Sequence, residues 1–182
     1  MLSKVKRWFE KTKIPDTLTP EAEKTILEKG SEAQRVALAA REDARPEVLY
    51  YLTDDRSADV RRQVAANPST PVQADAKLSS DSEESVRTEL ARKIARLVPN
   101  INETEARQLR EKTIDVLEKL AQDQLPKIRA MVANEIKSSA DVPKALIERL
   151  ARDLEDIVAT PILEYSPLLG DEDLCELIAA GI

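Results

Sequence analysis

The chain has 182 residues, no His, one Cys and a net charge of −6. The absence of His removes the commonest general base and metal ligand, and a single Cys excludes an intrachain disulfide. No run of about 18 apolar residues is present and the first residues lack the apolar core of a signal peptide, so we expect a cytoplasmic protein. We expect no catalytic residue, no cofactor and no metal site.

Residues 1–15 are predicted to form a basic amphipathic helix. Residues 1–13 carry a net charge of +4, which leaves −10 on the remainder of the chain. The favoured interpretation is that this helix packs as a cap over the first repeat. Docking in the groove of a partner protein and contact with an anionic membrane surface are the alternatives. In either alternative the contacting side chains would be Lys4, Lys6, Arg7, Trp8 and Phe9.

Residues 16–182 are predicted to form a single helical-repeat domain. A pattern of Leu, two residues, Asp, four residues and Val or Ile recurs along this part of the chain. The four sets are Leu52/Asp55/Val60, Leu78/Asp81/Val86, Leu120/Asp123/Ile128 and Leu150/Asp153/Val158. An apolar residue follows four positions after each Val or Ile, and Ala comes next in the first three sets. Recurrence over such periods indicates stacked supersecondary units.

Each position of the pattern has a physical interpretation. The Leu ends a helix on its buried face, the Asp is the N-cap of the next helix, and the Val or Ile continues an apolar stripe at helical period. Asp81 and Glu84 have the spacing of a capping box. Thr19-Pro20 and Thr70-Pro71 are typical of an N-cap followed by Pro in the first turn. The sequence therefore predicts an all-α fold, a right-handed α-solenoid of stacked two-helix hairpins.

Two segments modify this regular pattern. The long interval before Leu120 is interpreted as one longer helix, with Asn102 as its cap and an apolar stripe that begins at Leu109. Residues 18–30 match residues 169–181 at a constant offset, and the second copy stops where the first continues into another helix. We therefore expect the chain to be the front part of a longer repeat protein, or a trimmed piece of one.

The repeat resembles known helical-repeat families. The recurrence of Asp, four residues and Val-Arg, followed by an apolar-Ala pair, resembles HEAT repeats. VRRQVAANPSTPVQ is similar to the leucine-rich-repeat variant, and RVALAAREDARPEVLYYLTDD with PILEYSPLLGDEDLCELI resembles a bacterial domain family of unknown function. The HEAT resemblance implies a ladder along the stack, in which Asp residues pair with Arg residues. Its members here would be Asp55, Asp81, Asp123, Arg61, Arg87 and Arg129, and the fourth repeat has Ala159 in place of the Arg.

Other residues are candidates for a functional role. One of Tyr50 and Tyr51 is expected in the core, and the other, exposed, would anchor a partner. Cys175 is predicted to be a buried, inert thiol. Six Arg residues could line a phosphate-binding groove, but we favour structural pairing because the body is acidic and lacks aromatic partners for bases. They are Arg61, Arg62, Arg87, Arg92, Arg96 and Arg129.

The composition favours a protein-interaction scaffold over an enzyme. Repeat stacks offer extended surfaces for a protein or peptide partner, and no catalytic constellation is visible. Besides the residues of the N-terminal helix, the predicted contact residues are Tyr50, Arg62 and Arg92. The alternative is a nucleic-acid-binding helical-repeat protein, such as a DNA-lesion binder or glycosylase, although the negative charge argues against nucleic acid. A peripheral membrane adaptor acting through residues 1–13 is a further alternative.

Overall fold

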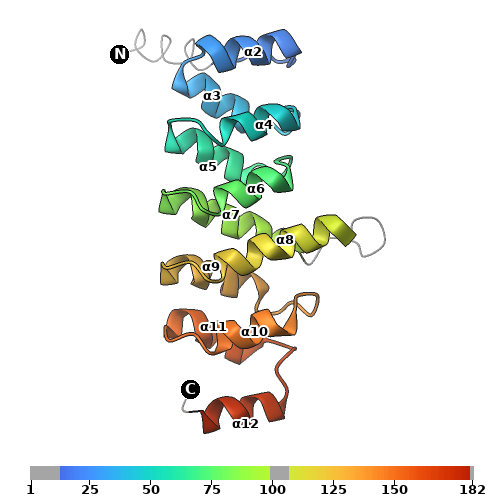
Figure 1. Cartoon of the computed structure of the whole chain (residues 1–182), viewed down its shortest axis with the longest axis vertical. Coiled ribbons are helices and arrows are strands. Elements are labelled where there is room, and N and C mark those ends of the chain that lie inside the picture. The colour runs from blue at the N-terminus through green and yellow to red at the C-terminus, as the bar shows by residue number, and fades with distance from the viewer. Residues whose placement is uncertain (1–12, 99–106, 181–182) are drawn as a thin grey trace. The chain divides into compact units, whose positions relative to one another are not determined.

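The computed structural model contains α-helices and no strand within the residues that it describes (Figure 1). The structure describes residues 13–98 and 107–180, and the all-α prediction is confirmed for this part of the chain. Residues 1–12 of the predicted basic helix and the predicted cap Asn102 lie outside the described residues. The chain divides into two compact units, Met1–Glu89 and Leu90–Ile182, and the division falls within helix α7.

The first unit is built from short helices that follow one another closely. They are α2 (Pro20–Lys29), α3 (Glu32–Ala39), α4 (Pro46–Leu52), α5 (Ala58–Ala66), α6 (Val72–Leu78) and the start of α7 (Glu84–Leu97). Helix α3 packs against α5 and α4 against α6, and from α2 to α6 each helix also contacts the next one in the chain. Helices α2, α4 and α6 thus follow one another on one side of the unit (Figure 1).

The second unit contains the remaining helices. They are α8 (Arg107–Leu120), α9 (Pro126–Ile136), α10 (Lys144–Ala151), α11 (Asp156–Tyr165) and α12 (Asp171–Ala179). Helix α11 packs against both α9 and α10, and α8 packs against α9. The predicted longer helix before Leu120 corresponds to α8, which has 14 residues.

The apolar positions of the repeated pattern form the cores of both units. The four Leu residues that open the pattern are at most 1% exposed, and the Val or Ile eight positions later is fully buried in each set. The apolar residues four positions after the Val or Ile are also fully buried; they are Val64, Leu90, Val132 and Ile162. The periodicity therefore predicted the buried stripe correctly. Leu109, which we placed on the same stripe, is instead 43% exposed.

The helix caps agree with the sequence in one case and differ in others. Thr19 caps α2 by accepting a hydrogen bond from the amide of Ala22, as predicted. Ser31 forms a capping box with Gln34 at the start of α3. The prediction that Thr70 caps α6 is wrong: its hydroxyl donates to the carbonyl of Val64 at 2.6 Å, because that carbonyl lies at the open end of α5.

Two further burial predictions are corrected. Cys175 is exposed on α12, where Leu177 is the buried apolar residue. Tyr50 and Tyr51 are both exposed, by 46% and 65%, because Val48, Leu49 and Leu52 already occupy the buried face of the short helix α4. Neither tyrosine is therefore part of the core.

Candidate protein-binding surface

The Asp of the repeated pattern forms the same turn in all four sets. Each carboxylate accepts a hydrogen bond from the backbone amide two residues later, at 2.9, 2.9, 2.9 and 3.1 Å for Asp55, Asp81, Asp123 and Asp153. This is an Asx turn, in which a short acidic side chain replaces a backbone acceptor. The N-cap prediction is therefore wrong: Asp55 lies two residues before Ser57, the N-cap of α5, and Asp81 lies three residues before Glu84, the first residue of α7.

Three arginines each bind one of these aspartates with two hydrogen bonds. The pairs are Arg35–Asp55, Arg61–Asp81 and Arg129–Asp153, with Nε–Oδ2 distances of 2.5, 2.6 and 2.7 Å. The Nη2–Oδ1 distances are 3.2, 3.0 and 2.8 Å. This fork geometry is the strongest common arrangement of a guanidinium and a carboxylate. We call these three pairs the Arg–Asp bridges.

The third nitrogen of each bridging arginine binds the turn that precedes its own helix. Arg61 Nη1 donates to the carbonyl of Asp55 and Arg129 Nη1 to that of Asp123, both at 2.8 Å. Arg35 Nη1 donates to the carbonyl of Gly30 at 3.0 Å. A single arginine side chain therefore joins two turns. One turn precedes the helix that carries the arginine, and the other is the corresponding turn of the following repeat.

The bridges shift the ionisation of both partners. Burial alone would raise the pKa of Asp55 and Asp81, but hydrogen bonds from the arginine and from a backbone amide hold the pKa of each carboxyl below the usual 3.8. The hydrogen bond from Arg129 lowers the pKa of Asp153 in the same way. The paired carboxylates are consequently ionised over the neutral range and hold the turns through charge-assisted hydrogen bonds.

The predicted ladder residues take specific places in this arrangement. Arg61 binds Asp81, which lies twenty positions later in the following repeat. It does not bind the carboxylate of Asp55 in the same repeat as Arg61. Arg87 donates to the carbonyl of Asp81 at 2.7 Å.

Arg35 and Asp153 were not predicted as members of the ladder, although the sequence carries a signal for both. An apolar residue and Ala follow Arg35 three and four positions later in the sequence. The same spacing follows Arg61 and Arg129. Asp153 needs no arginine in its own repeat, because its partner comes from the preceding one.

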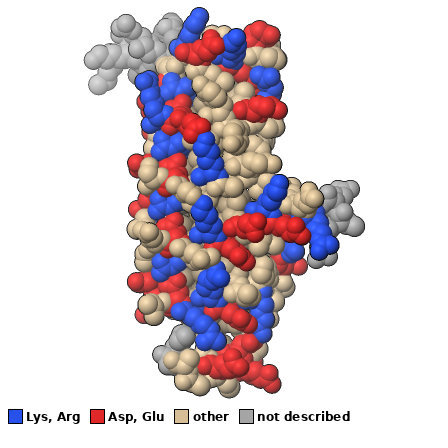
Figure 2. All heavy atoms as spheres, viewed as in Figure 1, with Lys and Arg blue, Asp and Glu red and all other residues tan. Residues whose placement is uncertain are grey.

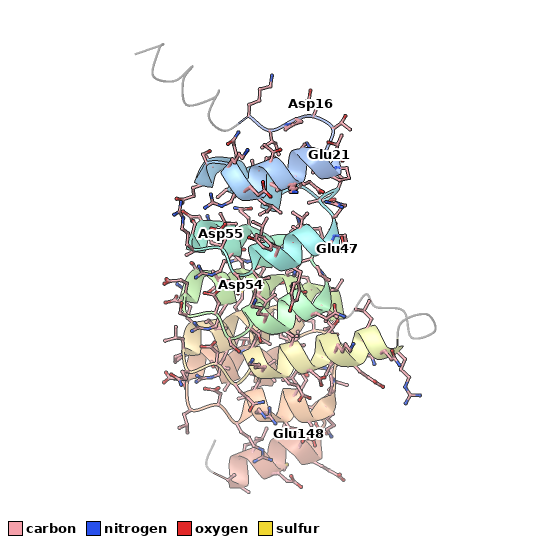
Figure 3. All side chains as sticks on the ribbon, turned by 45° about the horizontal axis from the view of Figure 1, so that its top comes forward. Asp16, Glu21, Glu47, Asp54, Asp55 and Glu148 are labelled. Carbon is pink, nitrogen blue, oxygen red and sulfur yellow. The ribbon has the colours of Figure 1, made fainter. Side chains whose placement is uncertain are left out.

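Exposed tyrosines distinguish α4 from the other helices of the first unit. Lys77 of α6 places its ammonium 5.5 Å from the centre of the Tyr50 ring and forms an ion pair with Asp54. Tyr51 contributes to a pocket of about 480 Å³ beside it. The pocket is lined by residues 27–30 at the end of α2, Arg35 of α3, and residues 54–56 after α4, where Figure 3 shows Asp54 and Asp55 next to each other.

The other predicted contact residues lie elsewhere or cannot be placed. Arg62 is half-buried and pairs with Asp59 of its own helix at 3.3 Å. Arg92 is half-buried in the second unit, where the nearby Arg96 binds Glu135 through two hydrogen bonds of 2.9 Å. The predicted contact residues of the N-terminal segment, from Lys4 to Phe9, lie outside the described residues.

No group of three His, Cys, Asp or Glu side chains within residues 13–98 and 107–180 is arranged to hold a metal ion. The helices described in these ranges include none with the length and apolar character needed to cross a membrane. No protein-family model matches the chain, and comparison with curated proteins finds no relative.

Proposed function

We propose that the chain is a non-catalytic protein-interaction scaffold built as a right-handed α-solenoid of HEAT-like helical repeats. Two features support this architecture. Alternate helices pack against each other within each unit, as α3 does with α5 and α9 with α11. The Arg–Asp bridges recur with the same atoms in both units, which is the behaviour of a repeated structural joint. Such repeats present extended surfaces to protein partners.

The observation that carries the proposed function is the exposure of two adjacent tyrosines on α4. Val48, Leu49 and Leu52 of this helix are at most 4% exposed, whereas Tyr50 and Tyr51 are directed to solvent. Tyrosine is enriched among residues that dominate protein-protein binding energy, because its ring offers a large contact area with few rotatable bonds. We therefore place the partner contact on the α4 side of the first unit.

The ion pairs support a protein partner over nucleic acid. The guanidinium groups of Arg35, Arg61 and Arg129 already bind aspartates, so their hydrogen-bond donors are not directed at phosphate. On the face shown in Figure 2, basic and acidic side chains are interspersed within each unit. Phosphate-backbone binding depends instead on clustered, unpaired Lys and Arg.

Affinity capture with the full chain tests the proposed function. We expect the wild-type chain to retain a specific protein from a lysate of the cells that express it, and the Tyr50→Ser/Tyr51→Ser variant to lose it. Truncating interface tyrosines commonly costs about 2 kcal/mol or more of binding free energy, roughly a thirtyfold loss of affinity. Tyr165→Ser is the matched control, because Tyr165 is also exposed, by 55%, but lies in the second unit. Capture that is unchanged in the double variant would contradict the placement on α4, and the absence of any specific protein would contradict the scaffold function.

A further inference from the structure

The turn between α10 and α11 exposes apolar side chains where the other repeats have polar ones. Leu154 is 99% exposed and Ile157 is 57% exposed. They lie one and four positions after the Asp of the repeated pattern. The other three sets have Arg56, Ser82 and Gln124 at the first of these positions and Asp59, Ser85 and Lys127 at the second. Because the same Asx turn forms in those sets, the fold does not require an apolar residue at either position.

A third exposed apolar residue lies on the neighbouring turn. Arg129 binds both the carbonyl of Asp123 and the carboxylate of Asp153, so it holds the turn between α8 and α9 beside the turn between α10 and α11. Leu125 belongs to the first of these two turns and is 36% exposed. We call Leu125, Leu154 and Ile157 the apolar turn patch. Single exposed apolar residues are common on protein surfaces, whereas neighbouring ones are typical of an interaction site.

The charged side chains of the turn between α10 and α11 leave an excess of negative charge. Two cations lie there, and each already has a carboxylate partner. Arg129 binds Asp153 at 2.7 Å, and Arg152 lies 4.0 Å from Glu176. Two further carboxylates are exposed and form no ion pair with any of the described residues, although one of them also attracts Arg129 at longer range. They are Asp156 and, near Arg129, Glu155.

Residues 1–13 of the chain have a composition that complements this surface. They carry a net charge of +4, whereas the remainder of the chain carries −10. Their apolar residues recur at the spacing of one helix face and include the only Trp and the only Phe of the chain. These residues are Leu2, Val5, Trp8 and Phe9. A basic amphipathic sequence of this kind binds a surface that offers apolar side chains flanked by carboxylates.

The residues that follow this segment are attached to the first unit. Gln34 of α3 donates a hydrogen bond to the carbonyl of Lys13, and Arg41 donates to the carbonyls of Pro15 and Asp16. The segment therefore leaves from the first unit, whereas the apolar turn patch belongs to the second. A contact between the two in different copies joins unlike surfaces, which is a head-to-tail arrangement.

We infer that the apolar turn patch binds residues 1–13 of a second copy of the chain. The patch covers the apolar side chains of the segment, and Glu155 and Asp156 lie beside its Lys and Arg residues. The inference goes beyond the proposed function, because it involves neither the tyrosines of α4 nor a partner protein.

Sedimentation equilibrium of the full chain tests the inference. We expect association that rises with protein concentration and weakens with added salt, because screening reduces the attraction between the exposed charges. The patch variant Leu154→Ser/Ile157→Ser and the segment variant Trp8→Ser/Phe9→Ser should each weaken association by about tenfold or more, because less apolar surface is buried in the contact.

Mixing the two variants gives a sharper test. The patch variant keeps an intact segment and the segment variant keeps an intact patch, so one productive contact can still form between them. We expect each variant alone to sediment as a monomer at a concentration where their equimolar mixture forms a dimer.

A matched variant controls for the loss of exposed apolar side chains. Leu109→Ser/Tyr165→Ser changes two residues of the second unit outside the patch, which are 43% and 55% exposed, and should associate as the wild type does. Circular dichroism and thermal melting check that all variants remain folded.

The inference would be overturned if the wild type is a monomer at every concentration, if the patch variant associates as the wild type does, or if the mixture of the two variants stays monomeric. The proposed function fails separately, when the tyrosine variant and the wild type capture the same proteins or none.

Discussion

At the scale of single residues, the bridging arginine is the most informative side chain of the repeat. Arg61 binds the carboxylate of Asp81 and the carbonyl of Asp55, so it restrains two turns at once. Its side chain is only 14% exposed and that of Asp81 only 6% exposed. A lysine could satisfy one of these acceptors at a time but could not reproduce the planar fork.

We therefore expect Arg61→Ala to lower the free energy of unfolding by about 2–3 kcal/mol. This is less than the cost of breaking a fully buried pair, because solvent can still reach part of Asp81. Arg61→Lys should recover only part of the loss. Urea denaturation of the full chain measures both values.

Arg62→Ala is the neighbouring control, because Arg62 forms an ion pair at the surface of its own helix and such pairs contribute about 0–1 kcal/mol. Equal losses for Arg61→Ala and Arg62→Ala would contradict the role of the bridge.

At the scale of elements, the joint between α5 and α6 depends on the buried residue Asn67. Its side-chain amide donates to the carbonyls of Ala39 and Arg41, both at 2.8 Å, at the end of α3. Its side-chain oxygen accepts the amide of Ser69 at 2.8 Å. One side chain thus satisfies the carbonyl end of an earlier helix and shapes the turn that leads to α6, which is consistent with the helix ending before Pro68.

Asn67→Ala should therefore cost about 1–3 kcal/mol, because it removes both hydrogen bonds and takes the donor from the buried carbonyl of Ala39. Asn67→Asp should cost at least as much, since a carboxylate cannot donate to either carbonyl. Chemical denaturation is the measurement. Asn134→Ala is the matched control: Asn134 is exposed and donates only within its own helix, to Ala130, so a change within about 0.5 kcal/mol is expected. A similar effect at both positions would show that Asn67 does not hold the joint.

At the scale of the whole molecule, the sequence predicted the buried stripe better than the polar contacts. Burial follows from periodicity, since a Leu or Val at helical spacing can face only one side, and Leu52, Val60 and Leu78 are buried as expected. The partner of Arg61 could not be read in this way, because the pattern pairs Arg61 with Asp55 of its own repeat and only the packing of successive helices brings it to Asp81. One of Tyr50 and Tyr51 was expected to be exposed, and the exposure of the second was missed for a related reason: helix α4 has seven residues, and Val48, Leu49 and Leu52 fill its buried face.

The Arg–Asp bridges also predict how stability depends on pH across both units. Asp55, Asp81 and Asp153 have folded-state pKa values below the usual 3.8, so the folded chain binds fewer protons than the unfolded chain in acid. The stabilisation from each bridge is therefore complete above about pH 4 and is lost as the pH falls through the folded-state pKa. We expect the melting temperature to change little between about pH 5 and 7 on this account and to fall progressively below about pH 4.

Asp81→Asn isolates the contribution of one bridge to this profile. The variant should melt below the wild type at neutral pH, because a neutral amide loses the charge-assisted pair with Arg61. The difference should shrink toward zero as acid protonates Asp81 in the wild type, since both chains then carry a neutral side chain there. Asp59→Asn, at an exposed position on α5, should differ little from the wild type at every pH. Melting curves at constant ionic strength measure these differences, and a gap between wild type and Asp81→Asn that stays constant down to about pH 2 would mean that the bridge does not hold its aspartate ionised.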